Sequence, residues 1–365
     1  MTRSTIQRLR LLVLVVALSA GAGGLYAVIG AEPDESWVAE LAIGATIGSV
    51  ISFCIIGFEL FGAGHLFERG GRRLPLAATM LARTIVYGIA TMAALLIFPW
   101  LYEGVAPSPF RPGIVGDLVF SIAATFVVVS LTSIIQLIGP NVLGNLLSGR
   151  YYRPREEQRI VLFLDLVGST GIAERIGNVR SHALLSETFT RLSRVVTDEG
   201  GEVHRYVGDA LIATWPVGTL EENARPIRCL FACRDALEAA RSDLLARHGQ
   251  VPGFRAGLHS GPLVIGEIGG FKREIAFIGD AMNTAARIEQ ACRAAGHPLL
   301  ASKPLLERAA MPAGIVAISI GSHLLRGKAE RLELFALERT TAGRVAAAAP
   351  ARADAKSLGL IPPFG

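Results

Sequence analysis

Apolar residues are concentrated before Gly149 in this chain, where they form four long runs, and shorter apolar segments alternate with polar ones after it. Each run is close to the about 20 apolar residues that a helix needs to cross a bilayer. The runs cover residues 11–29, 41–58, 84–101 and 118–138. They predict an all-α domain of four transmembrane helices over residues 1–138.

The charged residues beside these runs predict how the helices cross the membrane. Arginines gather before the first run (Arg3, Arg8, Arg10), after the second (Arg69, Arg72, Arg73) and after the fourth (Arg150, Arg153, Arg155). The other two connections carry Glu32, Asp34 and Glu35, and Glu103, Arg111 and Asp117. Arginine-rich connections stay on the cytoplasmic side. We therefore expect a multi-pass protein of the plasma (inner) membrane with both chain ends in the cytoplasm.

The first run also has features of a secretory signal peptide, since it follows a basic start and contains Ala-Gly-Ala at residues 20–22. Its apolar core is longer than the about 7–15 residues of such peptides, which favours a retained helix. Cleavage would leave three spans with an outside start, so the C-terminal half is expected in the cytoplasm in both cases.

Polar and small residues within the runs bear on how the helices pack. Glu40, Glu59 and Arg83 each lie at the edge of a run, so we expect their side chains to extend to the membrane interface. Gly44 and Gly48 form a G-x-x-x-G step, which lets two helices approach closely. Packing within one four-helix unit and a dedicated dimer contact are both compatible with this step, and we favour the first.

The composition agrees with a membrane protein. The mean hydropathy of +0.44 is too high for an ordinary soluble enzyme. The 36 Lys and Arg against 31 Asp and Glu give a net charge of +5, but the arginines cluster beside apolar runs. We therefore interpret the charge as membrane topology with lipid as the partner, and expect no nucleic acid. Cys229 and Cys233 lack the further ligands of a zinc site and are expected to be buried, reduced thiols.

A linker and a tail flank the C-terminal domain. Residues 139–158 are expected to link the membrane domain to a domain at 159–339, and residues 340–365 are Ala-, Arg- and Pro-rich and expected to be disordered. Four apolar residues predict a short amphipathic helix in the linker: Val142, Leu143, Leu146 and Leu147. Tyr151, Tyr152 and Arg153 are expected at the lipid headgroups.

Strand and helix patterns alternate through the C-terminal half. One helix is predicted to begin with Ser181 as N-cap and to stop at Gly200, and a second covers residues 221–247. Strands are predicted at 254–258 and 263–268, as a pair around Ser260 and Gly261, and at 315–320 and 332–337. An antiparallel sheet with helices on one face, an α+β arrangement, accommodates this order.

The stretch Arg-Ile-Val-Leu-Phe-Leu-Asp-Leu-Val-Gly-Ser-Thr at residues 159–170 is the organising element of this half. Its five consecutive apolar residues predict a strand buried on both faces. The strand ends on Asp165, and Gly168, Ser169 and Thr170 open a helical pattern. A carboxylate beside a helix N-terminus suits a metal ion, with phosphates on the free N–H groups.

Two further stretches belong with it. Residues 202–215 predict a hairpin that turns at Gly208 and Asp209. Residues 278–287 open a helix with Asn283 and Arg287 four residues apart on one face. The three stretches resemble motifs of the class III nucleotidyl cyclases, which run F-x-D-x-x-G-x-T, G-D-x-x-x-A and G-x-x-x-N-x-A-x-R. The resemblance covers about residues 159–338 and implies a ferredoxin-like catalytic domain.

The family reaction is the attack of the ribose 3′-hydroxyl on the α-phosphate, with loss of pyrophosphate. Two ions of Mg²⁺ or Mn²⁺ per site can activate the attacking oxygen and neutralise the leaving group. Such ions need two carboxylates on adjacent strands, which Asp165 and Asp209 supply if the first strand pairs with the hairpin. The resemblance assigns both residues to the metals, with the backbone carbonyl of Leu166.

The resemblance also assigns nucleotide contacts. Asn283 would orient the ribose, and Arg287 would meet the charge that develops on the α-phosphate. Arg255 matches an arginine that holds the triphosphate, and Arg326 stands at the position of a phosphate-binding lysine. Two neighbours of these residues are expected to be structural: Asp280 as a helix N-cap and His259 as a packing residue.

The base-selecting positions depart from the family pattern. Arg205 stands where the family carries an adenine-selecting lysine, and Ala276 stands where its partner is usually Asp or Thr. The guanylate pattern, with Glu at the first position, is also absent. Adenylate is favoured because a cation at Arg205 disfavours the N–H donors of guanine, and Lys272 and Arg273 are expected to assist. The chain is thus expected to convert ATP to cyclic AMP.

Other functions fit parts of the pattern. A diguanylate cyclase is rejected because Gly200–Val203 follows a helix end and does not form a hairpin turn. A silent nucleotide-sensing domain, a receptor with a purely interacting cytosolic part and a guanylate cyclase remain as alternatives. The first two are disfavoured by the complete set of Asp165, Asp209, Asn283 and Arg287. In the family, two head-to-tail subunits share each site, so a homodimer is expected. The signal that the membrane domain reads is not evident from the sequence.

Overall fold

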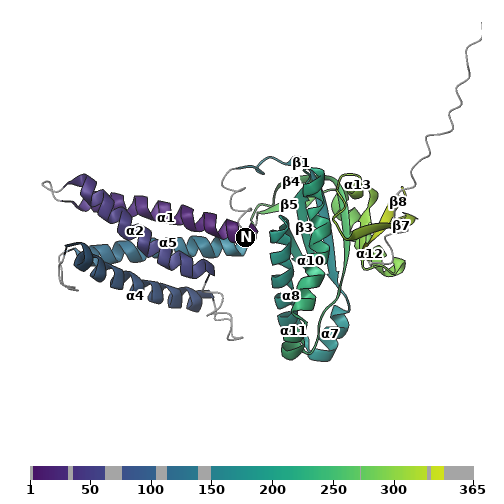
Figure 1. Ribbon diagram of the computed structural model, residues 1–365, viewed down its shortest axis with the longest axis horizontal. Helices are drawn as coiled ribbons and strands as arrows, with labels where there is room; N and C mark the ends of the chain where they lie inside the picture. The colour runs from purple at the N-terminus through teal and green to yellow at the C-terminus, as the bar shows by residue number, and fades with distance from the viewer. Residues whose placement is uncertain are drawn as a thin grey trace, which may run out of the picture. The chain divides into compact units, whose positions relative to one another are not determined.

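The computed structural model describes residues 3–31, 36–61, 76–103, 113–138, 149–271, 273–326 and 330–340. The chain forms two compact units, Met1–Arg150 and Tyr151–Gly365 (Figure 1). Several sequence predictions lie outside the described residues: the linker helix at 142–147, Lys272 and the tail from 341 onward.

The described residues of the first unit form four helices: α1 (Arg3–Gly30), α2 (Trp37–Phe61), α4 (Leu76–Glu103) and α5 (Ile114–Ile138). Of the described residues, three stretches are long and apolar enough to cross a membrane, and these are Leu9–Gly30, Trp37–Glu59 and Ile114–Leu131. The corresponding stretch of α4, Leu81–Ile97, is shorter. A fourth crossing therefore stays a prediction.

Small residues allow α1 and α2 to pack closely within this unit. A Cβ on Gly44 would lie 2.3 Å from the carbonyl oxygen of Gly23, and one on Gly48 would lie 2.4 Å from that of Ser19. These separations are shorter than any real contact, so both positions require glycine. The G-x-x-x-G step thus serves an intramolecular contact, as favoured above.

The expectation that Glu59 and Arg83 extend to the interface is wrong. The Glu59 side chain is 1% exposed and forms an ion pair with Arg83, which joins α2 to α4. The Tyr87 hydroxyl donates a hydrogen bond to the other carboxylate oxygen. A carboxylate and a guanidinium that face each other across two helices satisfy each other without reaching water. Glu40, by contrast, is only half-buried, in the first turn of α2.

The second unit is built on an eight-stranded sheet in the order β2-β3-β1-β4-β6-β8-β7, with β5 paired to β4. The strands are β1 (Arg155–Leu166), β2 (Glu202–Val207), β3 (Ala210–Pro216), β4 (Phe254–Ile268), β5 (Glu274–Ile278), β6 (Leu299–Ser302), β7 (Ile315–His323) and β8 (Leu332–Arg339). Among the described strand pairs, β4–β6 alone is parallel. The α+β class is confirmed.

Helices cover both faces of this sheet, which corrects the expectation of one covered face. They are α7 (Ser169–Ile176), α8 (Asn178–Asp198), α9 (Leu220–Asn223), α10 (Arg225–Ala239), α11 (Arg241–His248), α12 (Asp280–Ala295) and α13 (Lys303–Leu306). Leu162 of β1 belongs to the core beneath α8 and α10, which lie side by side (Figure 1). The preceding residue, Val161, points to the opposite face and packs with Ala281 and Ala285 of α12. A strand buried on both faces needs both covers.

Helix boundaries differ from the predictions where local capping decides them. α8 begins at Asn178 with Gly177 as N-cap, so Ser181 lies inside the helix and is buried. The predicted 221–247 helix is three helices. Thr219 and Glu222 form a capping box for α9, and Pro226 then fits only the first turn of a new helix.

Two strand predictions also need correction. The predicted pair around Ser260 and Gly261 is one continuous strand, because both residues stay in the ladder with β1, opposite Ile160 and Arg159. Tyr151 is not a headgroup residue: it is 4% exposed and packs with Val161 and other residues of the sheet. The ring of Tyr152, at 74% exposed, lies on the surface of this unit.

Candidate active site

The two predicted metal ligands lie at neighbouring positions, Asp165 near the end of β1 and Asp209 in the turn directly before β3. β1 pairs with β3 in antiparallel register, with Asp165 opposite Ala210, the residue after Asp209. The backbone N–H of Leu166 donates to the carbonyl oxygen of Asp209 over 3.1 Å. Gly208 turns the β2–β3 hairpin with a φ of 61°, a left-handed value that favours glycine. The predicted hairpin is confirmed, and it holds both carboxylates at one end of β1.

The charges at this place suit a divalent cation. Burial raises the pKa of Asp165, and the negative charge of Asp209 raises it further, while the Arg255 guanidinium, 3.4 Å from Oδ2, opposes the shift. Two carboxylates in a partly desolvated place repel each other until a cation joins them. Among the described residues no cluster of three or more His, Cys, Asp or Glu side chains could hold a metal. The remaining ligands would have to be backbone or substrate oxygens.

Ser169 occupies a position that was predicted to bind phosphate. It opens α7, directly after Gly168, whose φ of 75° is left-handed. Its hydroxyl donates a hydrogen bond to Oδ2 of Asp209. The side chain therefore holds the second carboxylate, and the first backbone N–H groups of α7 remain the candidates for phosphate binding.

Glu289 is a site residue that the sequence reading missed. It lies on α12, is 8% exposed, and places Oε1 3.4 Å from Nε of Arg255. Burial and the charge of Asp165 raise the pKa of Glu289 to about 7, with Arg255 opposing. A Cβ on Gly257 would lie 2.4 Å from the backbone nitrogen of Glu289, so this glycine lets α12 approach β4 closely. The sequence contains one signal for it: an acidic residue stands at a position where the helical pattern predicts an apolar core residue.

Asn283 and Arg287 lie on the other side of α12. The buried side of the helix is formed by Ala281, Thr284, Ala285, Ile288, Glu289 and Cys292. Arg287 and Glu289 are two residues apart, which is about 200° around a helix of 3.6 residues per turn. Asn283 is exposed and shares the face of Arg287. The structure therefore directs both side chains away from the Asp165 of the same chain.

Two neighbours of the motif residues are structural. The predicted N-cap role of Asp280 is wrong, because Gly279 is the N-cap and Asp280 begins α12. Its Oδ2 instead accepts a hydrogen bond from the Thr284 hydroxyl over 3.3 Å. His259 is buried, with Nδ1 2.8 Å from the Ser302 hydroxyl oxygen, as expected of a packing residue.

The base-selecting positions contain an ion pair that the sequence reading missed. Nη2 of Arg205, on β2, lies 2.7 Å from Oε1 of Glu274, on β5. Both side chains are partly exposed, at 45% and 40%. Glu274 precedes Ala276 by two residues, so the two side chains point to the same face of the strand. A carboxylate thus reaches the region where Ala276 itself has no polar group.

A stacked pair joins the same two strands. The rings of His204 and Phe277 stack with centroids 4.4 Å apart. Burial lowers the pKa of His204 to about 4, and the charge of Arg205 lowers it as well, with Glu274 opposing. His204 is therefore neutral at ordinary pH, and the stack holds β5 against β2.

Arg326 is exposed in the segment after β7. The preceding residue, Leu325, packs with Ile288 and Cys292 of α12. Within the described part of the chain, neither Arg326 nor Arg287 forms an ion pair or hydrogen bond. The structure therefore brings the exposed Arg326 to the helix that carries Asn283 and the half-buried Arg287.

Comparisons with known proteins identify the family of the catalytic unit. The family model of the adenylate and guanylate cyclase catalytic domain matches residues 151–297. Adenylate cyclase 2 of Rhizobium meliloti (strain 1021) is 32% identical over 338 residues, which are 89% of this chain and 90% of that protein. Adenylate cyclase 1 of the same organism is 33% identical over 146 residues, 39% of this chain and 22% of that protein.

The fold comparison points the same way. The structure of a bacterial light-regulated adenylyl cyclase, 19% identical, superposes with a TM-score of 0.54 over 63% of this chain and 67% of that one. The fold and site define a nucleotidyl cyclase. This chain belongs to the class III family of adenylate and guanylate cyclases, and the match to the first relative extends over its helical unit as well.

Proposed function

We propose that this protein is a membrane-bound adenylate cyclase that converts ATP to 3′,5′-cyclic AMP and pyrophosphate at sites shared by two copies of the chain. One observation carries the proposal. The paired strands β1 and β3 bring Asp165 and the turn residue Asp209 together, while Asn283 and Arg287 face away from them on the outer side of α12. A complete site then needs the outer side of α12 from a second copy.

The first half of the site binds metal. Asp165 and Asp209, with the carbonyl of Leu166, would hold two ions of Mg²⁺ or Mn²⁺. When bound, these ions activate the 3′-hydroxyl and stabilise the leaving pyrophosphate. Arg255 helps to keep Asp165 ionised and contacts the triphosphate. Glu289 forms an ion pair with Arg255 and so fixes the position of its guanidinium.

The second half of the site comes from the partner copy. Asn283 orients the ribose, so that the 3′-oxygen attacks the α-phosphorus in line and the bond to the β-phosphate oxygen breaks. Arg287 donates hydrogen bonds to the α-phosphate oxygens, on which negative charge develops in the transition state. Arg326 of the partner copy binds the phosphates together with the N–H groups at Gly168, Ser169 and Thr170 of the first copy. The support is that Arg287 and Arg326 are unpaired in the described chain.

ATP is the proposed substrate because of the Arg205–Glu274 pair. In the register that the resemblance implies, Arg205 donates to N1 of adenine, and Glu274 accepts from the 6-amino group in place of Ala276. Guanine presents an N–H donor at position 1 and a carbonyl acceptor at position 6. In the same register, the Arg205 donor would face the N–H, and the Glu274 acceptor would face the carbonyl oxygen, so neither hydrogen bond could form. Guanylate cyclase is the alternative, and it requires the base to bind in another register.

The membrane half completes the proposal. Three apolar helices in the described chain are long enough to span a bilayer. With α4 as a fourth crossing, the arginine distribution predicts that both chain ends, and so the catalytic unit, lie in the cytoplasm. The upstream signal is unknown. The proposed activity is tested by measuring turnover of the purified full chain. With Mg²⁺ or Mn²⁺, it should form cyclic AMP from ATP faster than cyclic GMP from GTP. Nucleotide binding without turnover would instead identify a silent sensing domain.

A further inference from the structure

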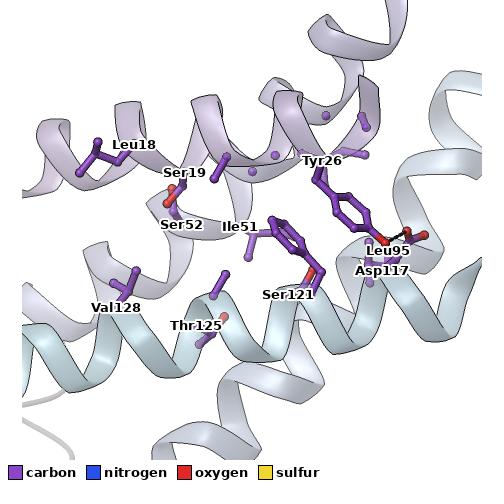
Figure 2. Close-up of a pocket in the computed structure, with 18 of the residues that line it drawn as sticks. Leu18, Ser19, Tyr26, Ile51, Ser52, Leu95, Asp117, Ser121, Thr125 and Val128 are labelled. Atoms are coloured by element: carbon purple, nitrogen blue, oxygen red, sulfur yellow. Dashed lines mark hydrogen bonds between the residues drawn. The ribbon is translucent and has the colours of Figure 1, made fainter. Parts of the chain in front are cut away.

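Two groups of polar residues lie outside the nucleotide site. In the membrane unit, the Tyr26 hydroxyl donates to Oδ1 of Asp117 over 3.2 Å, at one end of a largely apolar cavity of about 810 Å³ (Figure 2). Because these two groups are bonded to each other, they do not indicate which ligand the cavity would take. In the catalytic unit, the buried Arg159 makes contacts that lead to the base-selecting residues.

In the part of the chain that the structure describes, no backbone ladder joins the two strands that carry the base-selecting pair. Strand β2, with Arg205, pairs with β3, and β5, with Glu274, pairs with β4. The ion pair between Arg205 and Glu274 is 45% and 40% exposed, and exposed ion pairs contribute little to holding two segments together. The spacing of these two side chains must therefore be set by neighbouring contacts.

An aromatic contact sets part of this spacing. His204, directly before Arg205, stacks on Phe277 of β5 with ring centroids 4.4 Å apart. The β2–β3 register shifts between Val203 and Arg205, so His204 is the extra residue of a β-bulge. Consecutive residues of a regular strand point to opposite faces. The bulge re-aims this part of β2, and it thereby allows both His204 and Arg205 to contact β5.

Arg159 joins these contacts to the centre of the sheet. It lies on β1, which pairs with β3 and β4, and its side chain is 4% exposed. Its Nη1 lies 3.5 Å from Oε2 of Glu202, at the start of β2. Its guanidinium carbon lies 5.7 Å from the centroid of the Phe277 ring, within the range of a cation–π contact. One buried guanidinium thus contacts both β2 and β5.

Two further residues fix the orientation of this guanidinium. Glu157 accepts hydrogen bonds from Nε and Nη2 of Arg159 over 3.0 and 2.8 Å. The hydroxyl of Tyr151, the buried first residue of the catalytic unit, accepts one from Nη2 over 3.2 Å. The backbone carbonyl of Tyr151 accepts another from the N–H of Glu267 on β4 over 3.0 Å. The chain therefore enters the catalytic unit at a residue that supports Arg159.

We infer that Arg159 is a positioning residue for base recognition, which holds β2 and β5 so that Arg205 and Glu274 face the same edge of the base. The inference rests on the proposed adenylate cyclase activity, in which this pair contacts adenine. A guanidinium suits the role because its planar fork can bond carboxylates in its plane and contact a ring with its face, which an ammonium cannot do. Tyr151 supports the same orientation from the start of the unit.

Steady-state kinetics of the full chain test this role. Arg159→Met should raise KM for ATP about tenfold and leave kcat within about twofold, because base binding is weakened while the metal half is intact. The kcat/KM for GTP should change less, so the ATP/GTP ratio falls. Arg159→Lys should lower the ratio as well, since it keeps the charge but not the planar contact. An unmoved ratio in both variants, or a loss of kcat with KM unchanged, would overturn the inference.

Arg191→Met is the matched control. Arg191 also bridges two carboxylates, with Glu187 at 2.6 Å and Asp243 at 2.8 Å, but it does so between α8 and α11. Its loss should leave the ATP/GTP ratio at the wild-type value. An equal shift of the ratio in this control would show a general effect of lost ion pairs and would also overturn the inference.

Tyr151→Phe tests the support of Arg159 by a smaller change, because it removes one hydroxyl and keeps the buried ring. We expect the ATP/GTP ratio to fall about two- to threefold. When Tyr151→Phe is added to Arg159→Met, the ratio should fall no further, because the hydroxyl has lost its partner. Full additivity of the two changes would contradict an action of Tyr151 through Arg159.

Amide hydrogen exchange of the full chain in detergent separates this inference from the proposed function. Arg159→Met should speed exchange in peptides that cover β2 and β5 and leave β7 and β8 unchanged, whichever nucleotide the enzyme prefers. If the wild-type chain forms cyclic GMP faster than cyclic AMP, the proposed function fails, but faster exchange in both strands still supports the positioning role. If neither strand exchanges faster in the variant, the positioning role is overturned even where ATP is preferred.

Discussion

Glu289 and Arg287 lie two residues apart on α12 but serve opposite sides of it. Glu289 is buried with Oε1 3.4 Å from Arg255, which in turn reaches Asp165, whereas Arg287 faces outward and is unpaired in the described chain. The inner face of α12 therefore supports Arg255 and Asp165 of its own chain, and its outer face is available to the site of a second copy in the dimer that we propose. This division separates the site residues into two groups that can be tested apart.

The first prediction concerns the metal ligands. Asp165→Asn or Asp209→Asn should lower turnover by on the order of a thousandfold, because each removes a ligand charge from the site. Steady-state cyclic AMP formation measures the effect, and circular dichroism checks the fold. Asp235→Asn is the control, since it removes only an exposed partner of Arg339. Near-normal activity in either active-site variant would end the metal assignment.

The second prediction concerns the base. Glu274→Ala should lower kcat/KM for ATP by about tenfold while changing that for GTP less, because the acceptor for the 6-amino group is lost. Arg205→Glu should shift the ATP/GTP ratio in the same direction. Glu238→Ala serves as a matched control, because Glu238 also forms an exposed ion pair, with Arg241, but on α10. An unmoved ratio in both variants would remove the pair from base recognition.

The strands of the site were predictable, because their signals are local. Five apolar residues before Asp165 and a Gly-Asp turn before β3 specify a buried strand and a hairpin wherever they occur. The closeness of Asp165 and Asp209, the proposed metal ligands, followed from these two elements. The two carboxylates come close if the β2–β3 hairpin pairs with β1, and the structure shows this β1–β3 pairing.

The missed residues depend on contacts between distant segments. Glu274 and Arg205 are 69 residues apart in the chain, and no local pattern indicates that β5 crosses to β2. The Glu59–Arg83 pair was misread for the same reason, because each residue alone sits at the edge of an apolar run. Ser260 and Gly261 favour a turn locally, but the long partner strand β1 overrides that preference.

The third prediction concerns acid stability. The pKa of His204 is lowered to about 4 in the folded unit, below the usual value of about 6.5. The unfolded chain therefore binds more protons between these values, so the free energy of unfolding falls as the pH is lowered from about 6.5 to 4. His204→Phe keeps a ring against Phe277 and should remove on the order of 2 kcal/mol of this loss. Urea unfolding across this pH range measures it, and an unchanged slope would contradict it.

The fourth prediction concerns the membrane ion pair. Glu59→Gln should destabilise the helical unit by about 3–5 kcal/mol, because it removes the buried carboxylate charge that forms the ion pair with Arg83. Adding Arg83→Met should restore much of that stability, since an apolar pair needs no charge balance. Thermal unfolding in detergent compares the single and double variants. If the double variant is as unstable as the sum of the single ones, the two residues are not coupled.

The last prediction concerns assembly. If each site combines Asp165 of one copy with Arg287 of the other, Asp165→Ala and Arg287→Ala chains should be inactive alone and regain activity when co-assembled. Random pairing makes half of the dimers mixed, and each mixed dimer has one intact site of two, so about a quarter of wild-type activity is expected. Asp165→Ala mixed with Asp209→Ala is the matched control. Both substitutions lie in the same half of the site, so no mixed dimer gains an intact site and activity should stay absent. Subunit exchange is verified with two affinity tags. If exchange is complete and the first mixture stays inactive, the site lies within one chain, and the outward face of Arg287 needs another explanation.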